Sequence, residues 1–407
     1  SGSTGRPKGV AVSHIGLANS ISFHRERWPR PDEPRVVAVG PTTFDSSIAE
    51  MIAALGLRGT LVIAPPMVFG GEELGAFLRE QRITHLLITP RALDTVDPAG
   101  LDNLQCVVSA GEACPPELVS RWAPNRLLFN EYGPTETTVW GTVSAALNPG
   151  ERITIGTPVR GLRAMVLDPR LEPVPVGVTG ELYLSGPQLA RGYASQHALT
   201  SERFVAAAHG EPGARMYRTG DLVRWDPSGS LIYLGRSDFQ VKIRGQRIEL
   251  GEIDSVLTAQ TGVQQAATVV HHEGGIGDRL VAYVSASGPD GLDVTELEVG
   301  HRAVHPQFMI PTQIIVLDEL PLTTSGKLDR HRLPRPVTAP KAFREPMTGN
   351  ERAVADAVAD VLGLDRATIG LDDDFFALGG NSLAATRLAA RIRESTAVDV
   401  PLRAIFS

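Results

Sequence analysis

The chain has 407 residues, of which 42% are hydrophobic and 21% charged, and this composition excludes a wholly disordered or fibrous protein. With 39 Lys and Arg against 46 Asp and Glu, the net charge of −7 provides no basic excess to neutralise a nucleic-acid backbone. No apolar run reaches the ~18–20 residues of a membrane helix. We therefore expect neither a nucleic-acid partner nor a membrane partner, and the length predicts about two to three domains.

Two cysteines, Cys106 and Cys114, are too few for a disulfide framework in a chain of this size. The first residues, SGSTGRPKG, do not form a secretory signal, because no apolar segment follows a basic start. Both features favour a reducing compartment, and we expect a cytoplasmic protein.

Short β-branched segments alternate with helical segments in the first part of the chain. This alternation predicts an α/β fold, with strands and one helix at residues 36–39, 60–63, 72–81 (the helix), 85–88 and 106–108. From about residue 150 short strands dominate, at residues 164–167, 180–184 and 231–234.

Proline gathers near the end, with four prolines in residues 333–346. Because proline can neither continue a helix nor donate to a sheet, this segment is typical of a semi-rigid linker. Apolar residues then recur at helical spacing in residues 349–362 and again from Leu383 to Arg393. The sequence therefore predicts a separate small helical domain after the linker.

Several polar, glycine-containing segments could carry chemistry. Residues 1–9 combine glycines, hydroxyls and lysine, which suits either a phosphate-binding loop or a flexible loop, and they lack the P-loop pattern. In Asn130–Glu136 a tyrosine could stack on a base and a carboxylate could hold Mg²⁺, or the segment is a Gly-Pro loop. In Tyr217–Leu222 an aspartate could accept from ribose hydroxyls or close an Asx turn.

Three later segments are equally open when taken singly. Gly235–Gly245 is rich in polar residues. The lysine of Ser325–Arg330 would ordinarily be solvated. The serine of LGGNS, Ser382, would ordinarily be a helix N-cap rather than a modification site.

The order of these segments is more informative than any one of them. The phosphate-loop-like start is followed by FDSS (44–47), NEYGPTE (130–136), GELYLSG (180–186) with ARGY (190–193), YRTGDL (217–222), GRSDFQVKIRGQRIELGEID (235–254), PLTTSGKLDR (321–330) and LGGNS (378–382). In this order the chain strongly resembles, over essentially all its residues, a nonribosomal peptide synthetase adenylation domain followed by a peptidyl carrier domain. The adenylation domain is an adenylate-forming enzyme, related to acyl-CoA synthetases and luciferase.

The resemblance implies a fold and a division of the chain. We expect an α/β adenylate-forming core at residues 1–237, a small mobile α+β subdomain at 238–334, a Pro-rich linker at 335–347 and an all-α helical-bundle carrier at 348–407. In that family roughly a third of the adenylation domain precedes the phosphate loop, and the carrier ends in a further helix. We therefore expect both ends to be incomplete, and residues 1–407 alone not to adenylate.

The family reaction joins an amino-acid carboxylate to the α-phosphate of ATP, releases pyrophosphate, and passes the acyl group to a phosphopantetheine thiol. Carboxylate and triphosphate repel each other, so positioning and charge neutralisation dominate catalysis. By motif match the resemblance assigns phosphate contacts to Ser3, Thr4, Gly5, Lys8 and Thr135, Mg²⁺ to Glu136, the adenine end to Gly111, Glu112, Asn130, Tyr132 and Tyr233, and the ribose end to Asp221 and Arg236.

The substrate pocket is also assigned by the resemblance. Asp45 matches the position that pairs with the substrate ammonium, and the other pocket positions are Ser46, Ala49, Leu87, Val108, Ala110, Glu131, Val139, Trp140 and Lys327. Burying Glu131 without compensation is costly. A polar or cationic substrate side chain is therefore one possibility, and the other is that Glu131 turns outward and the substrate is apolar.

Three residues of the C-terminal half are assigned to the catalytic cycle. Lys327 resembles the lysine that reaches the carboxylate and the developing charge. Asp238 resembles the hinge about which the small subdomain pivots, and Ser382 resembles the serine that carries 4'-phosphopantetheine. Asn381 stands where family members more often have His or Asp.

The implied partners are the amino-acid substrate, the chain's own carrier, neighbouring synthetase domains such as condensation, a phosphopantetheinyl transferase and, for some members, an MbtH-like protein. The implied product is an antibiotic or a siderophore. Two other functions stay open: an acyl- or aryl-acid adenylating ligase, which Asp45 and the carrier disfavour, and a non-catalytic docking module, which the presence of every motif residue disfavours.

Overall fold

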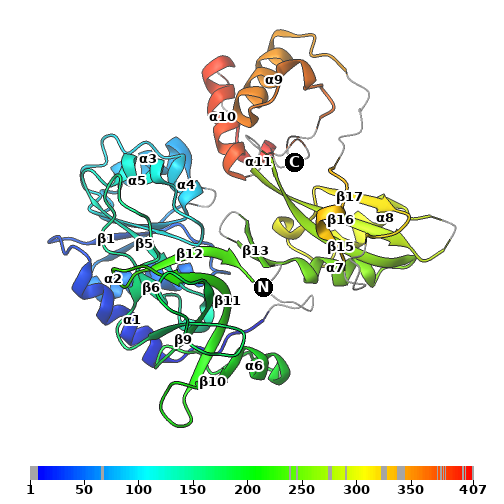
Figure 1. The fold of residues 1–407 in the computed structure, drawn as a ribbon. Coiled ribbons are helices and arrows are strands. Elements are labelled where there is room, and N and C mark those ends of the chain that lie inside the picture. The colour runs from blue at the N-terminus through cyan, green and yellow to red at the C-terminus, as the bar shows by residue number, and fades with distance from the viewer. Residues whose placement is uncertain are drawn as a thin grey trace. The chain divides into compact units, whose positions relative to one another are not determined.

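A seven-stranded sheet in the order β2-β1-β3-β4-β5-β6-β7 forms the centre of the first part of the chain (Figure 1). The strands from β2 to β5 run parallel, and β6 and β7 are antiparallel to their neighbours. Their bounds are β1 Arg35–Ala38, β2 Thr60–Ile63, β3 His85–Ile88, β4 Cys106–Ala110, β5 Leu127–Tyr132, β6 Thr142–Val143 and β7 Thr157–Pro158.

This structure is a computed structural model, and it divides the chain into two compact units that separate between Asp238 and Phe239. We describe each unit by itself. The described residues are 8–65, 68–237, 240–243, 246–273, 277–288, 291–321, 328–336, 344–373, 375, 378, 380, 382–396, 398 and 400–405.

Helices cover both faces of the seven-stranded sheet because alternate strand residues point to opposite sides. Leu86, Val107 and Leu128 pack on one face with α3, α4 and α5, whereas their neighbours in the chain pack on the other face with α2 and the end of α1. The helices are α1 His14–Arg27, α2 Ser46–Leu57, α3 Gly71–Glu80, α4 Pro90–Asp94 and α5 Pro116–Trp122. The sheet is therefore buried on both faces, which explains its continuous apolar strands.

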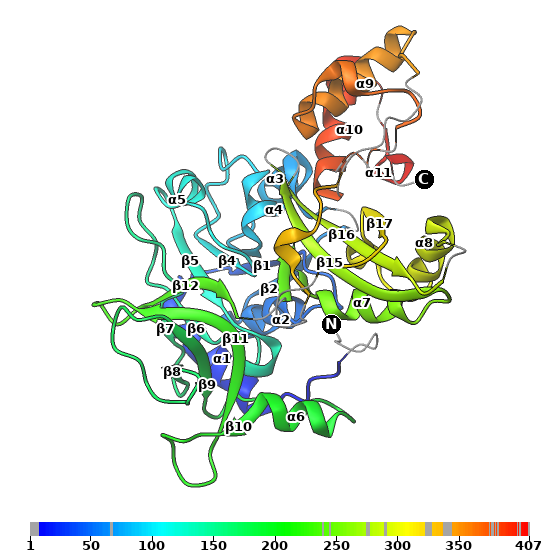
Figure 2. The ribbon, with the colours of Figure 1, turned by 45° about the vertical axis from the view of Figure 1, so that its right-hand side comes forward.

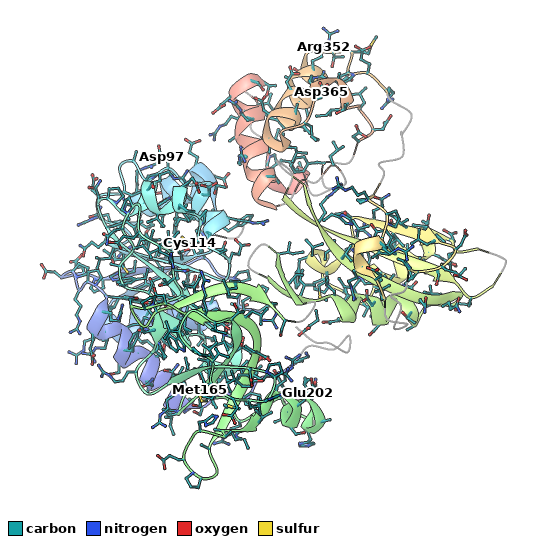
Figure 3. The ribbon with its side chains drawn as sticks, viewed as in Figure 1. Asp97, Cys114, Met165, Glu202, Arg352 and Asp365 are labelled. Atoms are coloured by element: carbon teal, nitrogen blue, oxygen red, sulfur yellow. The ribbon has the colours of Figure 1, made fainter. Side chains whose placement is uncertain are left out.

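A second, antiparallel sheet completes the first unit, with the order β10-β11-β9-β8 and β12 paired to β11. Its strands are β8 Arg163–Leu167, β9 Gly180–Ser185, β10 Phe204–Ala206, β11 Arg215–Trp225 and β12 Leu231–Arg236, and the helix α6 His197–Arg203 precedes β10. Figure 3 labels three residues of this unit, Cys114, Met165 and Glu202. The side chain of Cys114 packs in the core, whereas Glu202 is exposed.

The following subdomain contains a two-stranded hairpin and a three-stranded sheet. Figure 2 labels this sheet, β15 to β17, and the helices α7 and α8. In the order β15-β16-β17, the central strand β16 is antiparallel to β15 and parallel to β17. The elements are β13 Gln240–Ile243, β14 Gln246–Glu249, α7 Leu250–Thr258, β15 Val263–Glu273, β16 Gly277–Ala286, α8 Val294–Arg302 and β17 Gln313–Leu317. Leu257, Val284 and Leu297 join the helices to the sheet in one apolar core.

The last described part is helical, as the spacing of its apolar residues predicts. Its helices are α9 Gly349–Leu362, α10 Ser382–Thr396 and α11 Leu402–Ile405. Val358, Leu362 and Leu388 lie in their shared core. Thr348 begins α9 with a capping box: its hydroxyl accepts from the N–H of Glu351, whose carboxylate accepts from the N–H of Thr348.

The fold class predicted from the sequence is confirmed, with an α/β core, a small α+β subdomain and a helical end. The predicted strands 60–63 and 85–88 and the helix 349–362 match the observed bounds, and the other bounds differ by a few residues. Within the described residues, the helices are all too short or too polar to cross a bilayer.

Replacing the cap of α9 tests how much the helical part depends on this local interaction. We expect Thr348→Ala to lower its stability by about 1 kcal/mol, because one N–H of the first turn loses its partner. Amide hydrogen exchange of peptides from 349–362 should then speed up by roughly fivefold. Thr348→Ser keeps the hydroxyl and should exchange as the wild type does, so equal acceleration in both variants would contradict the capping account.

Candidate functional site

Four of the assigned residues of the first unit lie where the parallel strands β4 and β5 end. Gly111 and Glu112 follow β4 directly, and Asn130 and Tyr132 lie at the end of β5. In the register of these strands, Ser109 is opposite Asn130, so all four residues share one edge of the sheet. Gly111 has φ of +87°, a conformation that glycine adopts at no steric cost and that turns the chain sharply away from β4.

A buried hydrogen-bonded cluster surrounds Asp221, the residue assigned to the ribose end. Asp221 and Arg236 are opposite each other on β11 and β12, and their Oδ1 and Nη1 atoms lie 2.7 Å apart. The hydroxyl of Tyr132 donates to Oδ2, and the rings of Tyr132 and Tyr233 are 6.3 Å apart. Burial, followed by the nearby carboxylate, raises the pKa of Tyr132 well above its ordinary value, so it stays a donor. The structure therefore brings four assigned residues together.

Two assigned residues at the same edge have other protein partners. The carboxylate of Glu112 pairs with Arg91 of α4 at 3.7 Å. The amide of Asn130 donates to the carbonyl of Thr154 at 2.9 Å, and Asn130 is 5% exposed. These contacts fix the two side chains against the loops beside the sheet edge.

A second cluster surrounds Glu136, the residue assigned to Mg²⁺. Glu136 lies in the 3₁₀ turn η1, Thr135–Thr137, and is buried. The hydroxyl of Tyr193 donates to its Oε1 at 2.6 Å, and the ammonium of Lys8 lies 5.9 Å from the centre of the Tyr193 ring. Burial and the Glu136 charge raise the pKa of Tyr193 above its ordinary range. The same tyrosine thus contacts both a carboxylate, which suits a hard cation, and a lysine, which suits phosphates.

Asp45, which the resemblance assigns to the substrate ammonium, lies near the Glu136 cluster. It precedes α2, where an aspartate ordinarily caps the helix, yet its side chain makes no capping hydrogen bond to the first turn. Burial raises the pKa of Asp45 most, a hydrogen bond from Thr135 lowers it, and the charge of Glu136 raises it. The carboxylate is therefore held beside the threonine and glutamate of η1.

The loop after η1 is strained. Thr138 and Val139 have φ of 57° and 70°, and a β-branched residue such as valine rarely adopts this left-handed conformation. Such strain costs on the order of 1–3 kcal/mol per residue and persists only where the surroundings impose it. Here Thr138 donates from its hydroxyl to the carbonyl of Gln188 at 2.7 Å, and Gln188 donates to the carbonyls of Thr137 and Trp140. These bonds hold Val139 and Trp140 in place.

The apolar residues assigned to the substrate pocket lie together in one cluster on the α2 face of the sheet. Its members include Ala49, Leu87, Val108, Val139 and Trp140, with Ala110 partly buried against it. Ser46 begins α2, one turn before Ala49. Ala49 and Trp140 also line a small cavity together with His24 and Trp28.

Glu131 turns inward, and a histidine outside the assigned set compensates it. Glu131 is 2% exposed, so the alternative that it faces outward is wrong. Its Oε2 lies 3.2 Å from Nε2 of His24, which is also buried and stacks near Trp28 and Trp140, with ring centres 4.5 and 5.8 Å away. A buried carboxylate with a cationic or donating partner is far less costly than an isolated one.

Glu50 is a second buried carboxyl group outside the assigned set. It lies on α2 and is 1% exposed. Its Oε1 accepts from the N–H groups of Val39 and Gly40, at 3.1 and 2.9 Å, and so ties the end of β1 to α2. Burial raises its pKa to about 7, although the two backbone N–H groups oppose the shift. Glu50 thereby anchors the start of the loop that carries Asp45.

Five assigned residues lie outside the described residues: Ser3, Thr4, Gly5, Asp238 and Lys327. Ser382 is the first residue of α10, and its side chain is not among those described. Just before it, a Cβ on Gly380 would come within 2.4 Å of the Phe375 ring. The backbone that leads to Ser382 is therefore packed directly against an aromatic ring of the helical part.

Sequence reasoning missed His24 and Glu50, and it gave no role to Tyr193. Tyr193 lies in the quoted ARGY segment, so its motif was an available signal. Glu50 follows FDSS by three residues, and only its apolar neighbours hinted at burial. His24 pairs with a residue 107 positions away, and nothing local predicts that contact.

Three known families match successive parts of the chain. AMP-binding enzyme matches residues 1–194, the AMP-binding enzyme C-terminal domain matches 252–327, and the phosphopantetheine attachment site matches 352–407. Together with the α/β core and the helical end, they define the class as an adenylate-forming enzyme domain followed by a carrier domain.

Similar proteins indicate which adenylate-forming enzymes the chain resembles. The chain is 46% identical over its full length to a protein described as the probable non-canonical nonribosomal peptide synthetase CymA, of Salinispora arenicola. It is 42% identical to the phosphinothricin tripeptide synthetase PhsC of Streptomyces viridochromogenes. It spans 5% and 38% of their lengths. The solved structure of holo-PA1221, a nonribosomal peptide synthetase protein with adenylation and carrier domains bound to a vinylsulfonamide inhibitor, is 28% identical. Its TM-score is 0.76, with 96% of this chain and 66% of that chain covered. The chain belongs to the nonribosomal peptide synthetase family, as an adenylation domain followed by a peptidyl carrier domain.

The raised pKa of Glu50 predicts how the first unit responds to pH. Because the folded pKa is about 7 and the unfolded value is near 4.5, its contribution to stability is complete below about pH 4.5 and is lost as the pH rises to about 7. Glu50→Gln removes this dependence. The stability of the variant relative to wild type should therefore grow by on the order of 2 kcal/mol between pH 5 and pH 8.

Urea unfolding followed by tryptophan fluorescence measures this difference, because all four tryptophans lie in the Lys8–Asp238 unit. Glu33→Gln removes an exposed carboxyl group and should show no such growth. A pH-independent difference for Glu50→Gln would contradict the raised pKa.

Proposed function

We propose that this chain activates an amino acid with ATP, forming an aminoacyl-adenylate and pyrophosphate, and then passes the acyl group as a thioester to a phosphopantetheine arm on Ser382. The single observation that carries the proposal is the position of Asp45. Asp45 directly precedes α2, whose Ala49 belongs to the apolar cluster, and its carboxylate is hydrogen-bonded to Thr135, next to Glu136. The ammonium and carboxylate groups of an amino acid are adjacent, so an amine-binding carboxylate must lie close to the phosphate site.

Asp45 is also the feature that favours an amino acid over other acids. An acyl- or aryl-acid substrate has no ammonium group, and burying a carboxylate that meets no cation is costly. The Asp45 carboxylate would bind and orient the ammonium group, while the apolar cluster takes the side chain. Orienting the substrate carboxylate toward phosphate converts an encounter of like charges into a positioned, near-unimolecular step.

The nucleotide would bind at the two clusters described above. Asp221 accepts from Tyr132 and Arg236, and a carboxylate has about four lone-pair sites, so it retains capacity for ribose hydroxyls. Tyr132 and Tyr233 offer rings at the adenine end, with Gly111, Glu112 and Asn130 at the same sheet edge. Lys8 and the hydroxyls of Ser3, Thr4 and Thr135 would contact phosphates, with Gly5 allowing close approach of the backbone.

Glu136 would hold Mg²⁺, and its carboxylate oxygens and neighbouring phosphate contacts fit a hard cation. When bound, the metal supplies positive charge to the phosphate oxygens. Lys327 would bring an ammonium group to the reacting carboxylate. Asp238 would be the hinge that presents first Lys327 and then the thiol, which agrees with the separation of two compact units at this residue. The domain boundaries at 237, 334 and 347 are part of this proposal.

The chain's wider partners follow from the same proposal. A phosphopantetheinyl transferase would load Ser382, and neighbouring synthetase domains such as condensation would consume the thioester in making an antibiotic or siderophore. An MbtH-like protein is a candidate partner of the core. Two cysteines, both buried and unpaired, support a reducing cytoplasmic location.

Removing the Asp45 charge tests the amine-binding role. In amino-acid-dependent ATP–pyrophosphate exchange by the natural polypeptide that carries these residues, Asp45→Asn should lower kcat/KM for the amino acid by about 10- to 100-fold, because a charge-assisted contact is lost. The KM for ATP should change little. Asp32→Asn, an exposed carboxylate, is the control. Exchange stimulated only by a non-amino acid, or no ATP consumption with any acid, would overturn the proposed function.

Loading of Ser382 tests the carrier role separately. Incubation with a phosphopantetheinyl transferase and coenzyme A should add the mass of one phosphopantetheine group, located by peptide mass spectrometry on Ser382. Ser382→Ala should abolish the gain, whereas Ser395→Ala, on the same helix, should retain it. A gain that persists in Ser382→Ala would place the attachment site elsewhere.

A further inference from the structure

We propose that the buried pair of His24 and Glu131 makes the pocket selective for an amino acid whose largely apolar side chain carries one neutral hydrogen-bond donor, such as a phenol hydroxyl or an indole N–H. The acceptor for that donor would be Oε1 of Glu131. This inference rests on the proposed function and names its substrate class.

Glu131 presents one satisfied and one unsatisfied oxygen. Its side chain has no exposed surface, and Oε2 is 3.2 Å from Nε2 of His24. Oε1 is buried and has no hydrogen-bond partner among the residues that the structure describes. Buried acceptors without a partner are rare in folded proteins, because the lost contact with water is not replaced. An unpartnered carboxylate oxygen among assigned pocket residues is the feature that a ligand would satisfy.

Counting protons shows that the pair carries no net charge. Nδ1 of His24 lies 2.7 Å from the carbonyl of Ser20, which can only accept, so Nδ1 carries a hydrogen. The contact between Nε2 and Glu131 then needs one proton. With the proton on nitrogen the pair is imidazolium and carboxylate, and with it on Oε2 the pair is neutral imidazole and carboxylic acid. The net charge is zero either way, and Oε1 is an acceptor in both forms.

A pair without net charge does not favour a cationic side chain. A lysine or ornithine ammonium would enter a low-dielectric pocket with no negative charge left to balance it, and burial of an unbalanced charge is strongly unfavourable. Cys106, which interacts with Glu131, adds no charge, because burial raises the pKa of its thiol well above the ordinary value. The pocket therefore disfavours cations despite its carboxyl group.

The other assigned residues around Glu131 are apolar, which suits a largely apolar side chain such as an aromatic one. Glu131 is opposite Ala110 on the neighbouring strand, and Val108, Val139 and Trp140 belong to the same cluster. An aliphatic or phenyl side chain at this position would leave Oε1 unpaired. Sites built to hydrogen-bond a substrate hydroxyl or N–H reject the analogue without it by factors of up to about 10⁴–10⁵.

Substrate preference tests the proposal directly. In ATP–pyrophosphate exchange with the natural polypeptide that carries these residues, tyrosine or tryptophan, or a ring-substituted derivative of either, should give the highest kcat/KM. The value should exceed that for phenylalanine by about 100-fold or more. A preference for any other side chain, such as phenylalanine, leucine or lysine, overturns this inference and leaves amino-acid activation intact. No exchange with any amino acid overturns both.

Variants of Glu131 distinguish a loss of the hydrogen-bond acceptor from a general loss of pocket structure. Glu131→Leu should lower kcat/KM for the preferred donor-bearing substrate by about 100-fold and that for its donor-free analogue much less. Glu131→Gln retains an acceptor of similar shape and should keep most of the original ratio. Equal losses for both substrates in Glu131→Leu, with the ratio unchanged, would overturn the proposal. If Glu131→Leu does not fold, Glu131→Gln provides the test. A Glu131→Gln enzyme that prefers the donor-free analogue would overturn the proposal.

His24 is a positioning residue. Its removal should increase exchange with cationic substrates, whereas removal of the Glu131 carboxylate should decrease exchange with the preferred substrate. His24→Leu leaves the Glu131 carboxylate without its proton-sharing partner, so exchange with lysine or ornithine should rise by about 10-fold or more relative to wild type. His85→Gln is the matched control: His85 is the neighbouring buried histidine, bonded to Thr84 and to the carbonyl of Pro29. Unchanged discrimination against lysine and ornithine in His24→Leu would overturn the charge-balancing role.

Discussion

Compensation of carboxyl groups inside an apolar core is the constraint on which the first unit depends. Glu131 meets an imidazole from α1, Glu50 meets two backbone N–H groups at the end of β1, and Asp221 meets the guanidinium of Arg236 on the adjacent strand. A buried charge without such a partner costs far more than the contact returns. The first two contacts also fix where α1 and α2 lie relative to the parallel sheet, and the third joins β11 to β12.

Asp45 is a further carboxyl group of this unit, and the charge of Glu136 acts on it. A hydrogen bond from Thr135 and two from the backbone, at Asp45 and Ser46, oppose its burial and the charge of Glu136, and the net effect raises its pKa. In the proposed reaction a substrate ammonium would complete the compensation, and Mg²⁺ at Glu136 would remove the opposing charge. The amino acid and the Mg²⁺-bound nucleotide would thus each reduce the repulsion between Asp45 and Glu136. Binding of one would therefore favour binding of the other without any change in the fold. The strained backbone of Thr138 and Val139 lies in the same segment, where strain is maintained by surrounding hydrogen bonds.

Local pattern predicted the fold better than it predicted the site. Alternating strands and helices, and the capped helix at 349–362, follow from residue periodicity and turn chemistry, which act over a few residues. Motif order located Asp221 and Arg236, whose contact the register of two adjacent strands then explains. His24 could not be found in this way. Its helix shows little amphipathic pattern, and its partner is 107 residues away, so the contact exists only after the sheet and α1 have packed.

The two faces of the parallel sheet carry different sets of residues: one set packs against helices, and the other includes the residues that would select the substrate. Leu86 and Val107 face α3, α4 and α5, whereas the adjacent Leu87 and Val108 face the pocket side. Since successive residues of a strand point to opposite faces, a substitution at Leu87 or Val108 reshapes the pocket side and leaves the packing of the other face in place. Glu131 obeys the same geometry but is limited by charge, because any change there must also satisfy His24. Pocket shape can therefore vary residue by residue, whereas the polar contact can vary only as a pair.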